Sequence, residues 1–354
     1  MDNQSDVGQV IDPNAAAKRA ERKKKIDLVV KYIFFALALI CASIIVFVVL
    51  FIIIKGLQPF FSSYTEDGVT GSQNFWSFLS NTTWNGGTLN YGGGYLVINT
   101  LYLTILSLIV SIPLSILTSV LITRIAPKSI SYIFQTGIEL LAAIPSVIYG
   151  LFGMGFINPI VANIAGTGGN SILSAALVLA LMSIPTMTLM STTAIKAVNP
   201  NLIKASLALG ASPTQTNFKI VLKDAQSGIF AGIILGVGRA LGEATAVQMV
   251  VGNSLGGIHF GLFDPSSTLT SQMLMGIGEA TPGTLGYDIR FSAGIFLILL
   301  ILLIDLTLNY IKNLMYARRT GQPIKPSPIR IFFTSFIPKM ARKLTAKNGG
   351  AGNE

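Results

Sequence analysis

The sequence predicts an all-α integral membrane protein that crosses the bilayer six times, with both termini in the cytoplasm. Three observations predict this class. Of the 354 residues, 51% are hydrophobic and only 11% are charged, the mean hydropathy is +0.65, and six apolar runs each reach the length of about 20 residues that a bilayer-spanning helix needs. The predicted spans are residues 32–54, 95–122, 132–157, 171–194, 226–251 and 291–311.

The first span, residues 32–54, is an unbroken run of mostly Ile, Val, Leu and Phe that no small-residue cleavage pattern follows. A secretory signal peptide has a shorter apolar core and such a pattern, so we expect this helix to be retained. Cys41, the single cysteine, lies inside it. One cysteine forms neither an intrachain disulfide nor a cysteine metal cluster, and we expect no metal site.

The positive charges predict the orientation. Of the 25 Lys and Arg residues, 22 fall before the first span, between spans two and three, between spans four and five, or after the last span. Cytoplasmic segments of membrane proteins are enriched in Lys and Arg, so these segments and both termini are predicted to be cytoplasmic. The same charges favour contact with anionic membrane lipid, and we expect no nucleic-acid binding.

The remaining segments follow from this topology. We expect a basic cytoplasmic tail at 1–31, an external loop at 55–94, a membrane core at 95–312 and a second basic cytoplasmic tail at 313–354. Pro113, Pro145 and Pro185 lie deep inside spans two, three and four. Proline interrupts the helical hydrogen-bond pattern, which membrane proteins tolerate beside cavities or neighbouring helices. Broken helices therefore favour a transport path, and ordinary helix kinks are the alternative.

The cytoplasmic segment "NPNLIKASLALGASPTQTNFKIVLKDAQ" between spans four and five predicts two short helices joined at Gly210. Asn199-Pro200 and Ser212-Pro213 are typical helix starts, and apolar residues follow each at near-helical spacing. Such a unit in the cytosol needs a partner to cover its apolar face.

This segment resembles the EAA motif, the ATPase-coupling loop of binding-protein-dependent ABC importers. In that family an acidic-Ala-Ala triplet is followed at fixed spacing by Gly and then by Ile-x-Leu-Pro. The matching positions are Ala205, Gly210, Ile220 and Leu222. The departing positions are Lys204, Ser206 and Lys223, which stand where the family has Glu, Ala and Pro. The resemblance implies docking into a groove of a cytoplasmic ATPase, with an acidic partner for Lys204.

Three stretches make the resemblance more specific: "ELLAAIPSVIYGLFG", "SLALGAS" and "GIILGVGRALGEATAVQMVVGN". Together they resemble the PstC-type permease of phosphate ABC importers over about residues 30–315. The resemblance implies the type I ABC importer permease fold in a bacterial plasma membrane. It also implies three kinds of protein partner: a PstA-type second permease, two PstB-type ATPase subunits and a PstS-type external phosphate-binding protein.

The chain is not expected to be an enzyme. It lacks the Gly-rich P-loop sequence of ATPases, and its one histidine, His259, lies in the predicted external loop after span five, so we expect no Ser-His-Asp catalytic set. We expect no cofactor in this chain, with ATP and Mg²⁺ bound by the partner ATPase.

Span five contains the candidate substrate site. Arg239 and Glu243 are four residues apart inside an apolar run, which predicts that they share one helix face. Charged residues at bilayer depth are costly and usually functional. Arginine stays charged and binds phosphate oxygens through a planar fork, and the glutamate keeps the site from holding the anion too tightly. Thr245 adds a hydroxyl donor, and Glu139 is a weaker candidate for the path.

The sequence is also compatible with other interpretations. Arg239 and Glu243 could form a purely structural ion pair. Gly228, Gly232 and Gly236 recur every four residues, which is typical of close helix packing in membranes. The alternative functions are a permease for another oxyanion, a carrier or channel that works alone, or a membrane scaffold without transport.

Overall fold

The structure is a computed structural model of the chain and describes residues 13–66, 69–85, 89–166 and 168–320. The chain divides into two compact units, residues 1–55 and 56–354. Residues 1–12 of the predicted first tail and 321–354 of the predicted second tail lie outside the described residues.

Helix α1 spans Pro13–Phe61, so it is longer at both ends than the predicted span, and most of it forms the first unit. The helix therefore extends into the predicted first tail, from Pro13 onward. Residues 15–25 are Ala, Lys, Arg and Glu, which favour helix, and Pro13 suits the first helical position. No residue of the most apolar stretch of α1 is buried within the chain, which fits a helix that faces lipid.

The second unit starts with small elements that precede the membrane core. These are β1 (Tyr64–Glu66), β2 (Val69–Gly71), α2 (Phe75–Ser80), β3 (Trp84–Asn85) and β4 (Asn90–Tyr91). Strand β1 pairs antiparallel with β2, and β3 pairs antiparallel with β4 so that Trp84 faces Tyr91. The Trp84 and Tyr91 rings pack edge to face with centroids 5.1 Å apart, in a cluster that also holds Phe78 and residues of α12 and α13.

The core of the unit is helical. Its first half consists of α3 (Gly94–Val120), the π-helix η1 (Leu121–Ile125), α4 (Lys128–Ala143), α5 (Ser146–Phe152), the π-helix η2 (Gly153–Ile157), α6 (Asn158–Ala165) and α7 (Ile172–Lys196). Its second half consists of α8 (Pro200–Ala208), α9 (Pro213–Gln215), the π-helix η3 (Thr216–Val221), α10 (Leu222–Gly242), α11 (Thr245–Val250), α12 (Leu269–Leu274) and α13 (Leu285–Thr320).

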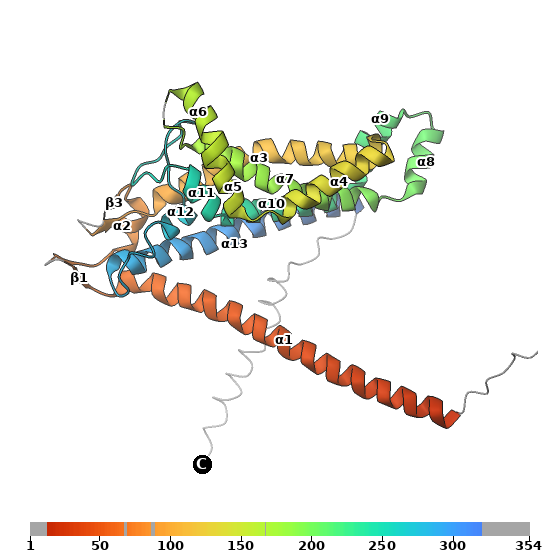
Figure 1. Cartoon of the computed structure of the whole chain (residues 1–354), viewed down its shortest axis with the longest axis horizontal. Helices are drawn as coiled ribbons and strands as arrows, with labels where there is room; N and C mark the ends of the chain where they lie inside the picture. The colour runs from red at the N-terminus through yellow and green to blue at the C-terminus, as the bar shows by residue number, and fades with distance from the viewer. Residues whose placement is uncertain (1–12, 67–68, 86–88, 167, 321–354) are drawn as a thin grey trace, which may run out of the picture. The chain divides into compact units, whose positions relative to one another are not determined.

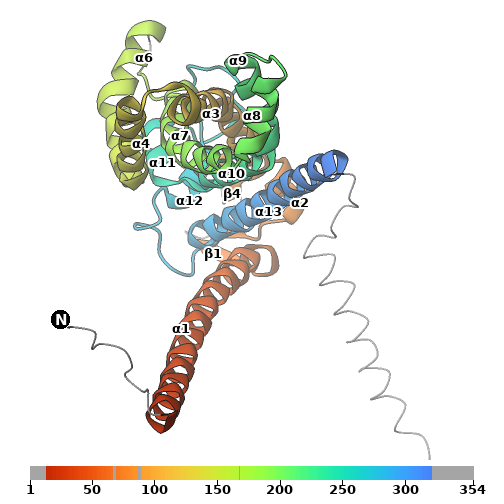
Figure 2. The ribbon, with the colours of Figure 1, turned by 90° about the vertical axis from the view of Figure 1, so that its right-hand side faces the viewer.

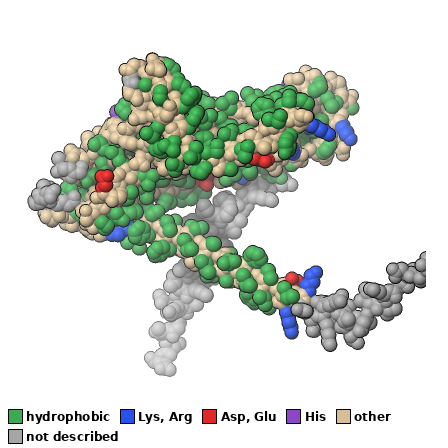
Figure 3. All heavy atoms as spheres, viewed as in Figure 1, with side chains coloured by type: hydrophobic (Ala, Val, Ile, Leu, Met, Phe, Trp, Pro, Cys, Tyr) green, Lys and Arg blue, Asp and Glu red, His purple; other side chains and the backbone are tan. Residues whose placement is uncertain are grey.

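Helices α3, α7 and α10 pack side by side along most of their length, and α13 lies against α10 (Figures 1 and 2). Helices α8 and α9 lie at one end of this bundle, and the β-strands with α2 and α12 lie at the other end (Figure 1). The face of the bundle in Figure 3 is mostly hydrophobic along its middle, and Lys and Arg side chains show at the α8 and α9 end. Its surface therefore has the character expected of a protein embedded in lipid.

Small hydroxyl residues line the contact between α3 and α7. Ser107, Ser111, Ser115 and Ser119 recur every fourth residue of α3, and each is at most 1% exposed. Ser115 also donates a hydrogen bond to the Ile184 carbonyl of α7, at 3.3 Å. Small residues let membrane helices approach closely, so these serines explain why α3 and α7 form an extended contact.

Among the described residues, six helices are long and apolar enough to cross a membrane, as predicted. Two predicted boundaries are wrong. The run 132–157 is divided at Ile144 and Pro145, whose backbones are extended, and the third candidate span is instead Ser146–Ala165. Proline lacks an N–H and disfavours helix in the residue before it, which explains this break. The run 226–251 is also interrupted, at Glu243 of the candidate substrate site.

Candidate functional site

Helix α10 ends at Gly242, inside the apolar run that was predicted to be one continuous span. Glu243 has an extended backbone, with φ −75° and ψ 119°, and the next helix, α11, starts at Thr245. The Glu243 carboxylate Oε1 accepts a hydrogen bond from the Ala246 backbone N–H at 3.0 Å. A helix start has unpaired N–H groups and favours a negative charge, so Glu243 stabilises the first turn of α11.

This break corrects the prediction that Arg239 and Glu243 share a face of one helix, because Arg239 lies within α10 and Glu243 lies at the interruption that follows it. Arg239 is half-buried and donates a hydrogen bond from Nη1 to the Thr186 hydroxyl Oγ1 at 2.7 Å. Among the described residues, no carboxylate lies within the 4.0 Å ion-pair distance of its guanidinium. The chain therefore orients the arginine with a neutral partner and leaves its charge uncompensated by Glu243.

The packing of α10 against α7 places Arg239 beside Thr186. Along α10, Gly228 faces Ala194 of α7, and a Cβ added at Gly228 would lie 2.5 Å from the Ala194 Cβ. A Cβ added at Gly232 would lie 2.9 Å from the Met190 Cβ of α7, and Gly236, one turn before Arg239, lies against Met187. The predicted packing role of this glycine track is confirmed. The close approach also brings the arginine within hydrogen-bond distance of α7.

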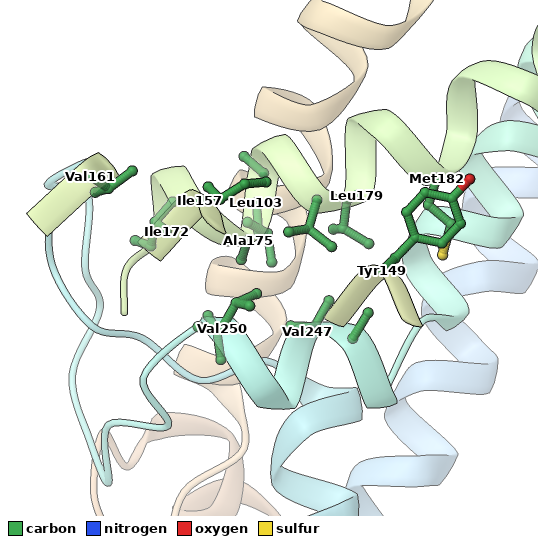
Figure 4. Close-up of a cluster of buried hydrophobic side chains, with 14 residues drawn as sticks. Leu103, Tyr149, Ile157, Val161, Ile172, Ala175, Leu179, Met182, Val247 and Val250 are labelled. Carbon is green, nitrogen blue, oxygen red and sulfur yellow. The ribbon is translucent and has the colours of Figure 1, made fainter. Parts of the chain in front are cut away.

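Tyr149 of α5 lies in the neighbourhood of the arginine. Its hydroxyl donates a hydrogen bond to the Leu141 carbonyl at 2.8 Å. Pro145 has no N–H to give to that carbonyl, so the tyrosine helps to satisfy it and holds α5 next to the break. The ring lies beside Met182 of α7 (Figure 4), one turn before Thr186, and the hydroxyl interacts electrostatically with Arg239.

The other two predicted path residues are placed differently. Thr245 is half-buried at the first position of α11, two residues after Glu243. Glu139 is exposed on α4 and accepts a hydrogen bond from Gln135 Nε2 at 2.9 Å, while Lys196 Nζ donates to Gln135 Oε1, also at 2.9 Å. The structure therefore brings Glu139 together with Gln135 and Lys196 rather than with Arg239.

Sequence reasoning missed Thr186 and Tyr149. Thr186 directly follows Pro185, the proline inside α7, and Tyr149 lies in the stretch "IPSVIYG" that follows the Pro145 break. The available signal was a polar residue directly after a proline for Thr186, and one helical turn after a proline for Tyr149. Neither residue is near Arg239 in the sequence, so the Thr186 hydrogen bond and the proximity of Tyr149 are visible only in the folded chain.

A second candidate site is the segment from Asn199 to Leu222, called the loop hairpin below. Its two parts are helix α8 and the α9–η3 segment, as predicted, and they are joined at Gly210, whose φ of +85° is in the left-handed region. Asn199 caps α8, and Ser212 forms a capping box with Gln215 at the start of α9. The Ser206 and Thr216 hydroxyls lie 2.9 Å apart and join the two parts.

The loop hairpin exposes a mixed apolar and positive surface. Leu209, at the tip, is 89% exposed, and Leu202, Leu207, Phe218 and Ile220 are exposed as well. Lys204 and Ala205 are exposed on α8, Ser206 is half-buried beneath them, and Leu222 is half-buried at the start of α10. Exposed apolar residues in a cluster mark an interaction surface. The hairpin is therefore suited to bind another protein.

The six membrane-length helices, the interrupted helices around a half-buried arginine and the exposed loop hairpin together define a multi-span transport permease. No group of His, Cys, Asp and Glu in the described part of the chain is arranged to hold a metal ion.

The chain belongs to the family of binding-protein-dependent transport system inner membrane components, which it matches over residues 97–320. It is therefore a multi-pass protein of the bacterial inner membrane and a transport subunit rather than an enzyme.

Two curated relatives represent the sequence similarity. The chain is 34% identical over 281 residues to the "Probable ABC transporter permease protein YqgH" of Bacillus subtilis (strain 168). This alignment covers 78% of this chain and 88% of that protein. It is 32% identical over 225 residues to the "Phosphate transport system permease protein PstC" of Pasteurella multocida (strain Pm70). That alignment covers 58% of this chain and 70% of the relative.

A solved structure shows the same fold. The crystal structure of a bacterial alginate ABC transporter, in complex with an alginate pentasaccharide-bound periplasmic protein, contains a chain that aligns with a TM-score of 0.58. The alignment covers 86% of this chain and 99% of that chain at 17% identity. The predicted permease fold is therefore confirmed.

Proposed function

We propose that this chain is the permease subunit of an ATP-driven importer of inorganic phosphate. Its similarity to PstC phosphate permeases supports the substrate. The observation that carries the proposal is Arg239, a half-buried guanidinium inside the bundle whose protein partner is a neutral hydroxyl. Guanidinium binds phosphate oxygens through paired N–H donors. A bound phosphate supplies the negative charge that no carboxylate of the described residues places within ion-pair distance of Arg239.

The proposal includes the partners of such an importer. A PstA-type permease completes the path, two PstB-type ATPases bind ATP and Mg²⁺, and a PstS-type protein delivers phosphate from outside. The ATPase docks on the loop hairpin, whose exposed Leu209 enters a groove and whose Lys204 pairs with an acidic residue.

The same reasoning orients the chain in the membrane. Lys196, Lys204, Lys219 and Lys223 are carried by the end of α7, the loop hairpin and the start of α10, where Lys and Arg side chains show in Figure 3. Positive residues accumulate on the cytoplasmic side, so this end and both termini face the cytosol.

The test is uptake of labelled phosphate by cells in which this chain is the one phosphate permease of its type. Arg239→Lys keeps a charge without the planar fork and should transport poorly, and Arg239→Ala should not transport. The decisive variant is Arg239→Met combined with Glu243→Leu, which removes both charges and keeps the side-chain volumes. It should assemble and carry no phosphate.

Three results would contradict parts of the proposal. Near-parental uptake by the double variant would show that Arg239 and Glu243 have only a structural role. A parent chain that imports sulfate but not phosphate would be a permease for another oxyanion. Uptake that persists without any ATPase subunit would identify a carrier or channel that works alone.

A further inference from the structure

Thr186 occupies a special position beside the candidate anion site. Its hydroxyl is the one hydrogen-bond acceptor that the described residues give to the Arg239 guanidinium, at 2.7 Å. A guanidinium carries five N–H donors, so this contact leaves most of them for a ligand. A hydroxyl accepts through oxygen and keeps its own hydrogen to donate, and no acceptor among the described residues takes that hydrogen.

A carboxylate at this position would act differently from a hydroxyl. It would neutralise the arginine and repel an anion, whereas threonine holds the side chain in place without cancelling its charge. Glu243, the nearest acid in the sequence, is instead engaged by the Ala246 N–H at the start of α11. The fold thus separates the acid from the arginine and gives the arginine a partner that is compatible with an anion.

The buried neighbours of Thr186 hold its backbone in place. Met187, the next residue, is buried against Gly236 of α10, and Pro185, the preceding residue, is buried inside α7. The hydroxyl hydrogen of Tyr149 is given to the Leu141 carbonyl. Of these two hydroxyls, Thr186 is therefore the one that remains able to donate to a ligand.

We propose that Thr186 and Arg239 form a two-residue anion cradle, contributed by α7 and α10, in which the Thr186 hydroxyl positions the guanidinium and donates its own hydrogen to a phosphate oxygen. This inference rests on the proposed function and adds a residue to its substrate path. Both groups are donors toward the ligand, so the cradle favours an oxyanion with at least two accepting oxygens.

The test compares hydroxyl-free and hydroxyl-bearing variants of Thr186. Thr186→Val keeps the shape without the hydroxyl, Thr186→Ala is a smaller variant without it, and Thr186→Ser retains it. Thr193→Val is the matched control, because Thr193 is exposed on the same helix and its hydroxyl donates to the Leu189 carbonyl at 3.0 Å. Maximal phosphate uptake and the half-saturating phosphate concentration are measured per assembled complex.

The expected result is a fall in maximal uptake of about tenfold or more for Val and Ala, as for the loss of a hydrogen bond to a charged group. Uptake should stay within about threefold of the parent for Ser, which keeps that bond, and at the parental value for the Thr193 control. The half-saturating concentration should not change, because the external binding protein sets it. The Ser variant distinguishes hydrogen bonding from packing. Serine keeps the hydroxyl but leaves a small void in place of the threonine methyl group, and we expect it to transport.

Two outcomes overturn the cradle. One is near-parental uptake by both hydroxyl-free variants, and the other is a Ser variant as inactive as the Val variant. If the parent transports phosphate and Arg239→Met does not, either outcome removes Thr186 from the site and leaves the proposed function intact. A parent that does not transport phosphate contradicts the proposed function itself.

Discussion

Replacing Gly232 with alanine adds one methyl group at a close contact between α10 and α7. The added Cβ would lie 2.9 Å from the Met190 Cβ and 3.4 Å from the Met187 carbonyl oxygen. Carbon atoms in contact prefer a separation of about 3.8 Å, so the helices must move apart by about 0.9 Å. If that movement extends along α10 to Arg239, the 2.7 Å bond to Thr186 lengthens to about 3.6 Å and is lost.

The free-energy change follows from two opposing effects. Overpacking costs about 1–3 kcal/mol, whereas alanine in place of glycine gains about 1 kcal/mol of helix propensity. Gly238, on the same helix, has no atom within 4 Å of its added Cβ, so Gly238→Ala receives only the propensity gain. The difference in unfolding free energy between the two variants should therefore be about 1–3 kcal/mol.

The assay is denaturant unfolding of the purified complex in detergent, with phosphate uptake measured in parallel. We expect Gly232→Ala to unfold more easily and transport less than Gly238→Ala, which should match or exceed the parent in stability. Equal stability and equal uptake for the two variants would refute the argument that close packing of α7 and α10 sets the position of Arg239.

Two further predictions concern the loop hairpin and the topology. Gly210→Val places a β-branched residue at φ +85° on an exposed turn, which should destabilise the turn by about 1–2 kcal/mol. The protein should remain in the membrane, and co-purification of the ATPase should fall. Continued co-purification with parental uptake would exclude the hairpin as the docking element. In a Cys41→Ser background, a cysteine at exposed Trp76 should react with a membrane-impermeant maleimide in intact cells, and a cysteine at Lys204 should react only after lysis. Labelling at position 204 in intact cells would reject the proposed orientation.

The sequence by itself determined the class, the number of spans and the loop hairpin. Hydropathy over about 20 residues is a local property, so the six runs were readable without a fold. The turn at Gly210 and the caps at Asn199 and Ser212 were also readable, because their hydrogen bonds connect residues two or three positions apart.

Only the tertiary structure decided which groups meet at the candidate site. Hydropathy cannot detect a break within an apolar run, so Arg239 and Glu243 were predicted on one face, and the interruption at Glu243 separated them. The contact between Arg239 and Thr186 joins residues 53 positions apart. It depends on the close packing of α7 and α10, and that packing is a property of two helices that neither sequence segment specifies alone.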